Sequence, residues 1–499
     1  MRGAEPKVSG GFRVVWVTPL LVGLGLRGIL AGFTGRPSVD GAAFLLPLAE
    51  EFLDGDFQDW RWGTFPPLYP AMVAAFRLIV VDSVLAGQVV SVLAGALTII
   101  PGAMLAGRLV GPRATAPAAW LLAALPLACQ YSARPQTEAL YALLLAWGLY
   151  AFVRLLDEPS VIIASFLGTA AGLAAATRPE GAGIFLAGCG AILARRGGRW
   201  GLQLVALILP FIVLSIPGAL ITKQVTGQWK LSSKAGYIFY RNLQDNPDEF
   251  YFRLTPDREH LLFETYIRSP EGTRPFADLP VEPGQVVSRY ASSLGRMLLN
   301  FPRVFDVPLI LLALLGVLVS PRPRWTRSGR AVAILLVAYL IVLPIFSSER
   351  RFWVPLLPIL IPLAARGLLS IPARWRRISL IATILILLPH AGSPVRDQGY
   401  SWRDSPERRL ARLVGAEATV LSEDGRVAIF AGAGHVFLPV APADDLIEFA
   451  KRRGARFLAV DPARLETRRP GLLLDLGDRL EKLGEESGRD RTIVLYRLR

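Results

Sequence analysis

The chain has 499 residues, of which 52% are hydrophobic and 19% charged, and its mean hydropathy of +0.41 is too apolar for an ordinary soluble protein of this length. A formal charge of +15 would suit a nucleic-acid-binding protein, but the arginines lie mainly in short connectors between apolar runs, where such residues orient membrane helices. We therefore predict a polytopic membrane protein and reject nucleic-acid binding.

Apolar runs long enough for a hydrocarbon core about 30 Å thick recur along most of the chain. The first, Val14 to Phe33, is not followed by a small-residue cleavage site, so we expect a retained helix and not a signal peptide. In all we expect about eleven spanning helices, at residues 13-33, 84-107, 114-131, 138-155, 160-176, 181-194, 200-221, 304-320, 331-346, 352-371 and 377-390.

Basic residues fill alternate connectors, which predicts a cytoplasmic N-terminus and a C-terminus on the outer face of the membrane. The apolar segment Phe65 to Val81 is short and begins with Pro66-Pro67, and a crossing there would break the charge rule. We interpret it as a re-entrant or interfacial helix. The outer loop 34-82 also holds an acid-rich amphipathic stretch, which predicts a helix lying on the membrane surface.

Two further segments are predicted to lie outside the membrane. One is the loop 222-303, and the other is the tail 391-499, which follows a transmembrane domain of residues 1-390. The tail has the pattern of a small soluble α/β domain. We expect strands near Thr419, at Arg426 to Phe430, His435 to Val440, Arg456 to Val460 and Thr492 to Tyr496, and a helix at Asp444 to Arg453.

Two carboxylates occupy positions suited to chemistry. Asp40 follows the first span by a few residues, which places it at the outer water interface; it is either a catalytic group or a solvated charge. Glu138 begins a span, where it either complements the helix N-terminus or faces Asp40 as a second carboxylate. Either one could bind a divalent cation through its oxygens, whereas the two cysteines and three scattered histidines predict neither a disulfide nor a histidine-based metal site.

Several basic residues are predicted on the outer face, against the usual charge rule. Arg178 is either an interfacial anchor at a helix end or a phosphate ligand, and Arg350 and Arg351 interrupt an outer connector, where an anionic phosphate is a natural partner. Lys234 in the second outer loop is a further phosphate candidate, although loop lysines are ordinarily only solvated.

Five motifs carry a resemblance to a known family. The chain has, in order, Ser38-Val-Asp-Gly-Ala-Ala-Phe-Leu, Phe65-Pro-Pro-Leu-Tyr-Pro, Arg134-Pro-Gln-Thr-Glu-Ala-Leu-Tyr, Ala176-Thr-Arg-Pro-Glu-Gly and Glu349-Arg-Arg-Phe-Trp-Val-Pro-Leu-Leu-Pro. They resemble blocks of the GT-C glycosyltransferases, in particular the family of dolichyl-phosphate-mannose protein mannosyltransferases, lipid A aminoarabinose transferase and the RgtA/B/C/D-like bacterial transferases.

The resemblance implies an inverting transfer in which Asp40 is the catalytic base and Glu138 an auxiliary or metal-proximal carboxylate. It also implies that Arg178, Arg350, Arg351 and Lys234 face the carrier phosphate. Gly41 stands where many members carry a second acidic residue, which weakens the case for a metal, and Phe44 stands where they often carry tyrosine.

On this resemblance we expect a glycosyltransferase of the bacterial inner membrane. It would move a hexose or pentose from an undecaprenyl-phosphate or other polyprenyl-phosphate donor to a lipid, glycan or protein acceptor at the outer face. The main alternative is a transporter or flippase of lipid-linked sugars, although we find no charged residue in mid-helix to serve a coupling ion. An O-antigen ligase or polymerase, or a non-catalytic lipid-binding protein, are further alternatives.

Overall fold

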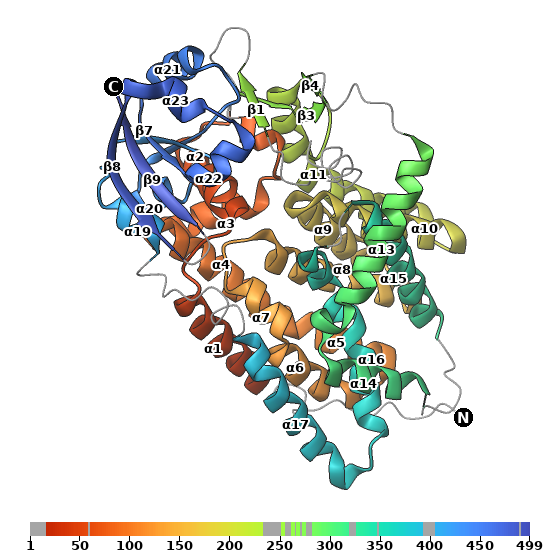
Figure 1. Ribbon diagram of the computed structural model, residues 1–499. Coiled ribbons are helices and arrows are strands. Elements are labelled where there is room, and N and C mark those ends of the chain that lie inside the picture. Colours follow the sequence, from red (N-terminus) through yellow and green to blue (C-terminus); the bar gives the residue numbers. More distant parts are fainter. Residues whose placement is uncertain are drawn as a thin grey trace, which may run out of the picture.

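A helical body carries a small sheet domain at one end (Figure 1). The computed structural model describes residues 16–57, 60–232, 251–254, 261–264, 266–269, 272–275, 282–318, 326–346, 349–392, 405–488 and 491–499. The helices of the body are α1 (Val17–Phe33), α2 (Leu46–Asp54), α3 (Leu68–Arg77), α4 (Ser83–Leu97), α5 (Ile99–Val110), α6 (Thr115–Ala124), α7 (Pro126–Ser132), α8 (Thr137–Asp157), α9 (Val161–Thr177), α10 (Ala182–Arg195), α11 (Trp200–Thr226), α13 (Pro283–Phe305), α14 (Val307–Leu318), α15 (Arg327–Phe346), α16 (Leu357–Ser370) and α17 (Ala373–Ala391).

Each of the eleven ranges predicted to span the membrane contains a helix. Several are shorter or more broken than a single straight span; α6, for example, stops at Leu125, whose backbone is extended, as is usual before a proline. Within the described residues, length and composition suit a crossing for Ser83–Val110, Thr137–Asp157, Trp200–Val225, Arg327–Ile345 and Arg350–Ser370, and for a sixth span if α13 and α14, bent by 99°, count as one. The helices are therefore confirmed, and the number of about eleven crossings stays a prediction.

The helices differ in how much of their surface the protein itself covers. In α8 about three quarters of the apolar window is buried, whereas in α11 and α15 the buried share is 17% and 22%. Helices that expose leucine and isoleucine side chains on this scale are suited to contact lipid and not water. At Gly168 of α9 an added Cβ would lie 2.1 Å from the Leu207 carbonyl of α11, so the small residues of Gly168-Thr-Ala-Ala-Gly172 allow these two helices to pack closely.

The segment predicted to form the first outer loop folds as two short helices against the body. A π-helix, Gly41–Leu45, leads into α2, which buries Leu46, Leu48 and Ala49, so a helix is present as predicted, and its position on the membrane surface stays a prediction. α3 falls within the predicted re-entrant or interfacial range. After it Leu78, Ile79 and Val81 are 78%, 82% and 87% exposed, which suits a segment that dips into the membrane surface.

The segment predicted to form the second outer loop contains two antiparallel hairpins, β1 (Tyr251–Leu254) with β2 (Leu261–Glu264) and β3 (Tyr266–Ser269) with β4 (Gly272–Pro275). The tail forms a five-stranded sheet in the order β6-β5-β7-β9-β8, in which β6, β5 and β7 are parallel and β9 and β8 are antiparallel to their neighbours. Its elements are α19 (Pro406–Ala411), β5 (Thr419–Ser422), α20 (Arg426–Ala431), β6 (Gly434–Phe437), α21 (Ala443–Arg452), β7 (Ala455–Val460), α22 (Pro462–Arg468), α23 (Leu472–Leu476), β8 (Leu480–Ser487) and β9 (Thr492–Leu498).

One predicted strand of the tail is wrong. Residues 426–430 belong to the helix α20, which buries the adjacent residues Val427 and Ala428 and is flanked by Gly425 and Gly432, both with positive φ. Such glycines close a short helical turn at both ends, which alternation alone does not reveal. The strand β8 was missed because it is a charged edge strand without a fully buried face.

Candidate active site

Four of the predicted site residues meet around one cavity of about 490 Å³. Asp40 stands between α1 and the π-helix, and Glu138 lies in the first turn of α8. Arg178 follows the last residue of α9, and Arg351 lies in the 3-10 helix Arg350–Leu356 before α16. All four side chains line the cavity, so segments that are more than 300 residues apart in the chain form one site.

The first pair in this site joins Arg351 to Asp40. A terminal nitrogen of the guanidinium donates to Asp40 Oδ2, and its Nε lies 2.8 Å from Glu349 Oε2. Both Arg351 and Asp40 are largely buried, with 17% and 24% of their side chains exposed. A carboxylate and a guanidinium held together at a partly dry site interact more strongly than a surface ion pair.

The second pair joins Arg178 to Glu138. The Arg178 guanidinium donates to Glu138 Oε1 and to Glu180 Oε1, each at 3.1 Å, and Glu138 is 2% exposed. Burial opposes the charge on Arg178, but the two carboxylates outweigh it and raise the pKa of Arg178 above its ordinary value. This arginine therefore stays cationic at any physiological pH.

The two arginines share a neighbour, the buried ring of Phe352. Its centroid lies 4.9 Å from Arg178 Cζ and 5.3 Å from Arg351 Cζ. Cations over an aromatic face are held by its quadrupole, and the two guanidinium groups are close enough that the charge of Arg351 lowers the pKa of Arg178. Phe352 thus keeps two positive groups side by side at the polar end of the cavity, where an anionic ligand would meet both.

The absence of a second acidic residue beside Asp40 has a steric cause. A Cβ added at Gly41 would lie 2.8 Å from the carbonyl oxygen of Pro135, three residues before Glu138. A Cβ added at Gly87 would lie 2.7 Å from the Cβ of the same proline. These close approaches bring the Asp40 segment against the Glu138 segment, and a longer side chain at position 41 would separate them.

A neutral hydrogen-bond chain holds the segment before Glu138. The Tyr69 hydroxyl donates to the Gly87 carbonyl at 3.0 Å and lies 2.8 Å from Ser91 Oγ, which is itself bonded to the backbone of Gln136. Tyr69 is fully buried, and burial raises its pKa far above the ordinary value, so the phenol stays neutral. Tyr69 is therefore a structural support of the Glu138 segment and is not placed to stack on a sugar.

The rest of the cavity is apolar. Its walls come from α8, α10, α15, the 3-10 helix Arg350–Leu356 and α16, and they include Leu145, Leu149, Ile184, Leu335, Val342, Leu343, Leu356 and Ile359. One end thus offers charged groups and the other a trough of aliphatic side chains, an arrangement suited to a ligand with a polar head and a hydrocarbon tail.

One predicted phosphate ligand, Arg350, is not brought to this cavity. Arg350 is exposed and does not line it, because neighbouring residues of the 3-10 helix point in different directions and only Arg351 turns inward. Lys234 lies outside the described residues. Within the described ranges no group of three or more His, Cys, Asp or Glu side chains could hold a metal ion, and Asp40 and Glu138 each already face an arginine, so this part of the chain does not fit a metal site.

Two further residues of the cavity, Glu180 and Tyr339, were not predicted from the sequence. Glu180 belongs to the Thr177-Arg-Pro-Glu motif, two residues after Arg178, and that spacing could have indicated its pairing. Tyr339 of α15 donates its hydroxyl to the Phe352 carbonyl at 3.1 Å and so supports the ring between the arginines. A single tyrosine inside an apolar run gave no signal of this contact.

Comparisons with known proteins agree with this architecture. Residues 64–219 match the sequence-family model described as dolichyl-phosphate-mannose-protein mannosyltransferase. No curated protein sequence matches the chain.

Solved structures extend the likeness to nearly the whole chain. ArnT from Cupriavidus metallidurans bound to undecaprenyl phosphate superposes with a TM-score of 0.59 and 16% identity over 98% of both chains. The oligosaccharyltransferase of Archaeoglobus fulgidus, in complex with Zn and sulfate, gives 0.56 and 12% over 96% of this chain and 72% of the other. The same archaeal protein, AglB, in complex with an inhibitory peptide and a dolichol-phosphate, gives 0.50 and 10%, covering 96% and 73%. These likenesses show a shared fold.

Proposed function

We propose that the chain is a membrane glycosyltransferase of the GT-C type, which transfers a hexose or pentose from a polyprenyl-phosphate donor, such as an undecaprenyl-phosphate sugar, to a lipid, glycan or protein acceptor. The observation that carries the proposal is the single cavity, with two carboxylate–arginine pairs at one end and an aliphatic trough at the other. The trough suits the polyprenyl chain and the charged end suits the phosphate and sugar.

The reaction follows from the groups at the polar end. Asp40 takes the proton of an acceptor hydroxyl as its oxygen attacks the anomeric carbon from the face opposite the phosphate. The bond between that carbon and the phosphate oxygen breaks, and the electron pair leaves with the polyprenyl phosphate. Attack opposite the leaving group inverts the configuration of the anomeric carbon.

Arg351 connects the base to the leaving group. Without substrate its guanidinium is engaged by Asp40, and the phosphodiester of a bound donor offers it an alternative anion, whose negative charge grows as the phosphate departs. The donor therefore draws Arg351 toward the phosphate and releases Asp40 Oδ2 from this arginine, so that it can accept from the acceptor hydroxyl. Arg178, oriented by Glu138 and Glu180, adds a second positive charge beside the departing phosphate.

The proposed reaction involves no metal ion. The carboxylates that would coordinate one are occupied by arginines, which supply positive charge at the place where the phosphate departs. Turnover should be the same with and without a chelator such as EDTA. Loss of turnover in EDTA that is restored by a divalent cation would contradict this part of the proposal.

The proposed location is the bacterial inner membrane, with a cytoplasmic N-terminus and the tail domain on the outer face. The exposed residue Leu474 of the tail offers a test, because Leu474→Cys should react with a membrane-impermeant maleimide in intact spheroplasts. Arg113→Cys, in a connector predicted to be cytoplasmic, is the matched control and should react only after lysis. The reverse pattern would overturn the proposed orientation.

The proposed activity is tested by incubating the purified protein in lipid vesicles with a panel of radiolabelled undecaprenyl-phosphate sugars and a crude membrane extract as the acceptor source. Wild type should transfer label from one donor, and Asp40→Asn should not. Asp54→Asn is the control, because Asp54 is exposed at the end of α2 in the same outer segment. Asp54→Asn should match wild type. Full activity of a folded Asp40→Asn protein would overturn the assignment of the base. Movement of lipid-linked sugar across the bilayer without transfer from any donor would favour the flippase alternative.

A further inference from the structure

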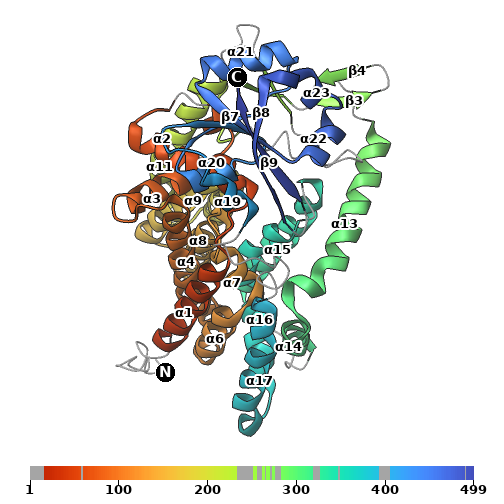
Figure 2. The ribbon, with the colours of Figure 1, turned by 60° about the vertical axis from the view of Figure 1, so that its left-hand side comes forward.

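The tail domain packs directly on the segment that carries Asp40. In Figures 1 and 2 the blue tail elements lie over α2 and α3. Side chains of both parts form one buried cluster, in which the rings of Phe44 and Phe437 lie 5.1 Å apart. Arg61, between α2 and α3, donates to the His435 carbonyl of β6 at 2.5 Å. These contacts therefore join the tail directly to the segments of the body around Asp40.

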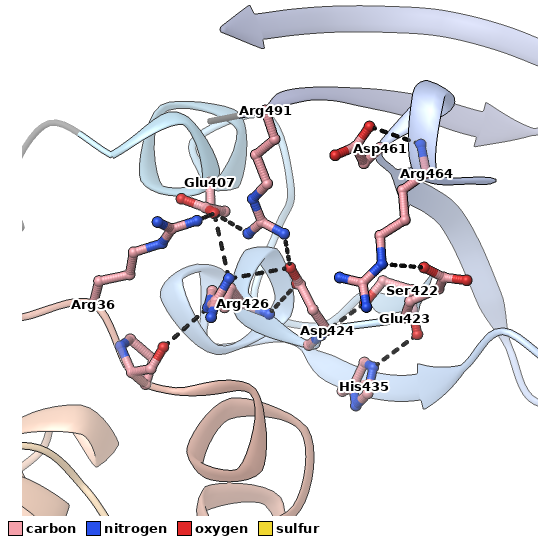
Figure 3. A network of polar contacts seen from close by, with 12 residues as sticks. Arg36, Glu407, Ser422, Glu423, Asp424, Arg426, His435, Asp461, Arg464 and Arg491 are labelled. Carbon is pink, nitrogen blue, oxygen red and sulfur yellow. Dashed lines mark hydrogen bonds and ion pairs between the residues drawn. The ribbon is translucent and has the colours of Figure 1, made fainter. Parts of the chain in front are cut away.

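A buried ionic network crosses this interface (Figure 3). Glu407 of α19, which is fully buried, pairs with Arg36 at 2.7 Å and with Arg491, and Arg491 also pairs with Asp424 at 2.6 Å. These arginines outweigh the effect of burial and lower the pKa values of Glu407 and Asp424 below their ordinary range. The network is therefore charged at neutral pH, and Arg36 is its link from the body, four residues before Asp40.

Arg426 reaches from the tail to the backbone next to Asp40. Its Nε donates to the carbonyl of Pro37 at 2.9 Å, and its terminal nitrogen lies 3.4 Å from Asp424. Burial lowers the pKa of Arg426 to about 10, so it remains cationic and continues to donate at neutral pH. From Pro37 the chain enters the turn of Asp40, in which the Gly41 amide donates to Ser38 Oγ at 3.0 Å.

The tail also touches the π-helix that follows Asp40. Gly425 has a φ of +68°, and an added Cβ there would lie 2.8 Å from the Ala42 carbonyl oxygen and 3.0 Å from Ala43 Cα. Two backbones thus meet without a side chain between them. Asp40 is held on one side by the Arg426–Pro37 contact and on the other by the Gly425–Ala42 contact.

We propose that the tail domain is a positioning element for the reaction, which places the Asp40 carboxylate through Arg426 and Gly425. The inference rests on the proposed function, in which Asp40 is the base. A base must stand within hydrogen-bond reach of the acceptor hydroxyl, and a displacement of about 1 Å can lower a rate by about 100-fold. Arg426 and Gly425 do not line the cavity, so donor binding depends on other residues.

Gly425→Ala gives the sharpest test, with Gly471→Ala as its matched control. Gly471 lies in the same domain with a φ of +80°, but an added Cβ there meets nothing within 4 Å. Both substitutions carry the same backbone strain, and only the first presses on the Asp40 segment. We expect Gly425→Ala to lower kcat by about 10-fold or more with an unchanged KM for the donor. Gly471→Ala should keep the wild-type kcat.

Arg36→Gln and Arg426→Gln weaken the same interface by removing charge instead of adding bulk. Both should lower kcat at an unchanged KM, and Arg426→Lys, which keeps a cation able to donate to the Pro37 carbonyl, should recover part of the loss. Replacing Arg36 should destabilise the fold less than replacing Arg426, because Glu407 keeps Arg491 as a partner. Arg36→Gln should therefore stay folded even if Arg426→Gln does not.

Parallel assays of Asp40→Asn separate the two levels of inference. If Asp40→Asn is inactive while Gly425→Ala and Arg36→Gln keep the wild-type kcat, the positioning role is overturned and the proposed function stands. A shared fall of kcat in Gly425→Ala and Gly471→Ala would also overturn it, because strain in the tail would then suffice. If Asp40→Asn remains active, the assignment of Asp40 as the base fails, and the positioning role that rests on it fails as well.

Discussion

The two carboxylates of the site are held by different means. The Asp40 segment is braced from outside the helical body by a charged network that runs into the tail domain, through Arg36 and Arg426. The Glu138 segment is held from within the body by neutral hydrogen bonds of Tyr69 and Ser91. Because the two supports share no residue, Asp40, the proposed base, and Glu138, the proposed auxiliary carboxylate, can be disturbed separately, and variants of each support should have distinguishable effects.

Among the groups that support the two carboxylates, the largest effect is expected at Arg351. Arg351→Gln removes an ion-pair partner of Asp40 and one of the two positive charges proposed to face the phosphate, so kcat should fall by about 100-fold or more. Arg350→Gln is the matched control, since Arg350 is its chain neighbour but is exposed and does not line the cavity. Steady-state transfer assays measure both. Equal losses for the two variants would mean that neither arginine has a particular role at the site.

A smaller loss is expected on the Glu138 side. Glu138→Gln leaves Arg178 with Glu180 as an ion-pair partner, so Arg178 should keep its charge and lose orientation. We expect kcat/KM to fall by about 10-fold, within the range for removal of one buried charged hydrogen bond. Glu158→Gln, at the exposed far end of α8, should leave kcat/KM unchanged. An unaffected Glu138→Gln enzyme would show that this carboxylate is only structural.

Lowering the pH should destabilise the contacts of the tail domain with the Asp40 segment before it affects the neutral hydrogen bonds of Tyr69 and Ser91. His435, beneath the interface, is buried beside Arg61, and its pKa is lowered from 6.5 to about 3. Between these values the unfolded chain binds a proton that the folded domain does not, so stability falls as the pH falls. The free energy of unfolding of the tail should drop by about 2 kcal/mol between pH 7 and pH 5 through this residue.

The carboxylates of the network act in the same direction at lower pH. Their lowered pKa values mean that the stability they contribute is present above about pH 4.5 and is lost as they become protonated. Hydrogen exchange of the tail at pH 7 and pH 5 measures the first effect, and His435→Gln should reduce it. If exchange in the tail is no faster at pH 5 than at pH 7, once corrected for intrinsic rates, the protonation account of this interface fails.

The smallest expected effect lies in the neutral support. Tyr69→Phe keeps the buried ring and removes the hydroxyl that bonds to Gly87 and Ser91, so it should lower stability by about 1 kcal/mol. Thermal unfolding in detergent measures the loss, and Ser91→Ala with the double variant completes a mutant cycle. Additive losses in that cycle would show that the two hydroxyls do not act as a chain.

The sequence predicted much of the body and part of the site. Apolar runs located every helix of the predicted spans, and ordered motifs pointed to Asp40, Glu138, Arg178 and Arg351. It did not predict that Arg351 and not Arg350 turns inward, because that depends on the local direction of a 3-10 helix. The support from the tail was equally hidden, since Arg36 and Glu407 are 371 residues apart and pair only through the fold.

The steric role of Gly41 was hidden in the same way. The sequence showed a missing acidic residue, but only the structure shows the Pro135 carbonyl that leaves no room for a side chain. The same limit applies to α20, where two glycines with positive φ convert an expected strand into a helical turn.

The measurement that tests the central claim most directly compares donor binding with transfer in Asp40→Asn. In the proposed mechanism the guanidinium of Arg351, which is paired with Asp40, also binds the donor phosphate, so removing the carboxylate charge should leave the Kd for an undecaprenyl-phosphate sugar unchanged or lower. Transfer should fall by about 1,000-fold, because the acceptor hydroxyl loses its base. Tight binding without transfer is the result that this account predicts. Transfer at the wild-type rate in the folded variant would contradict it.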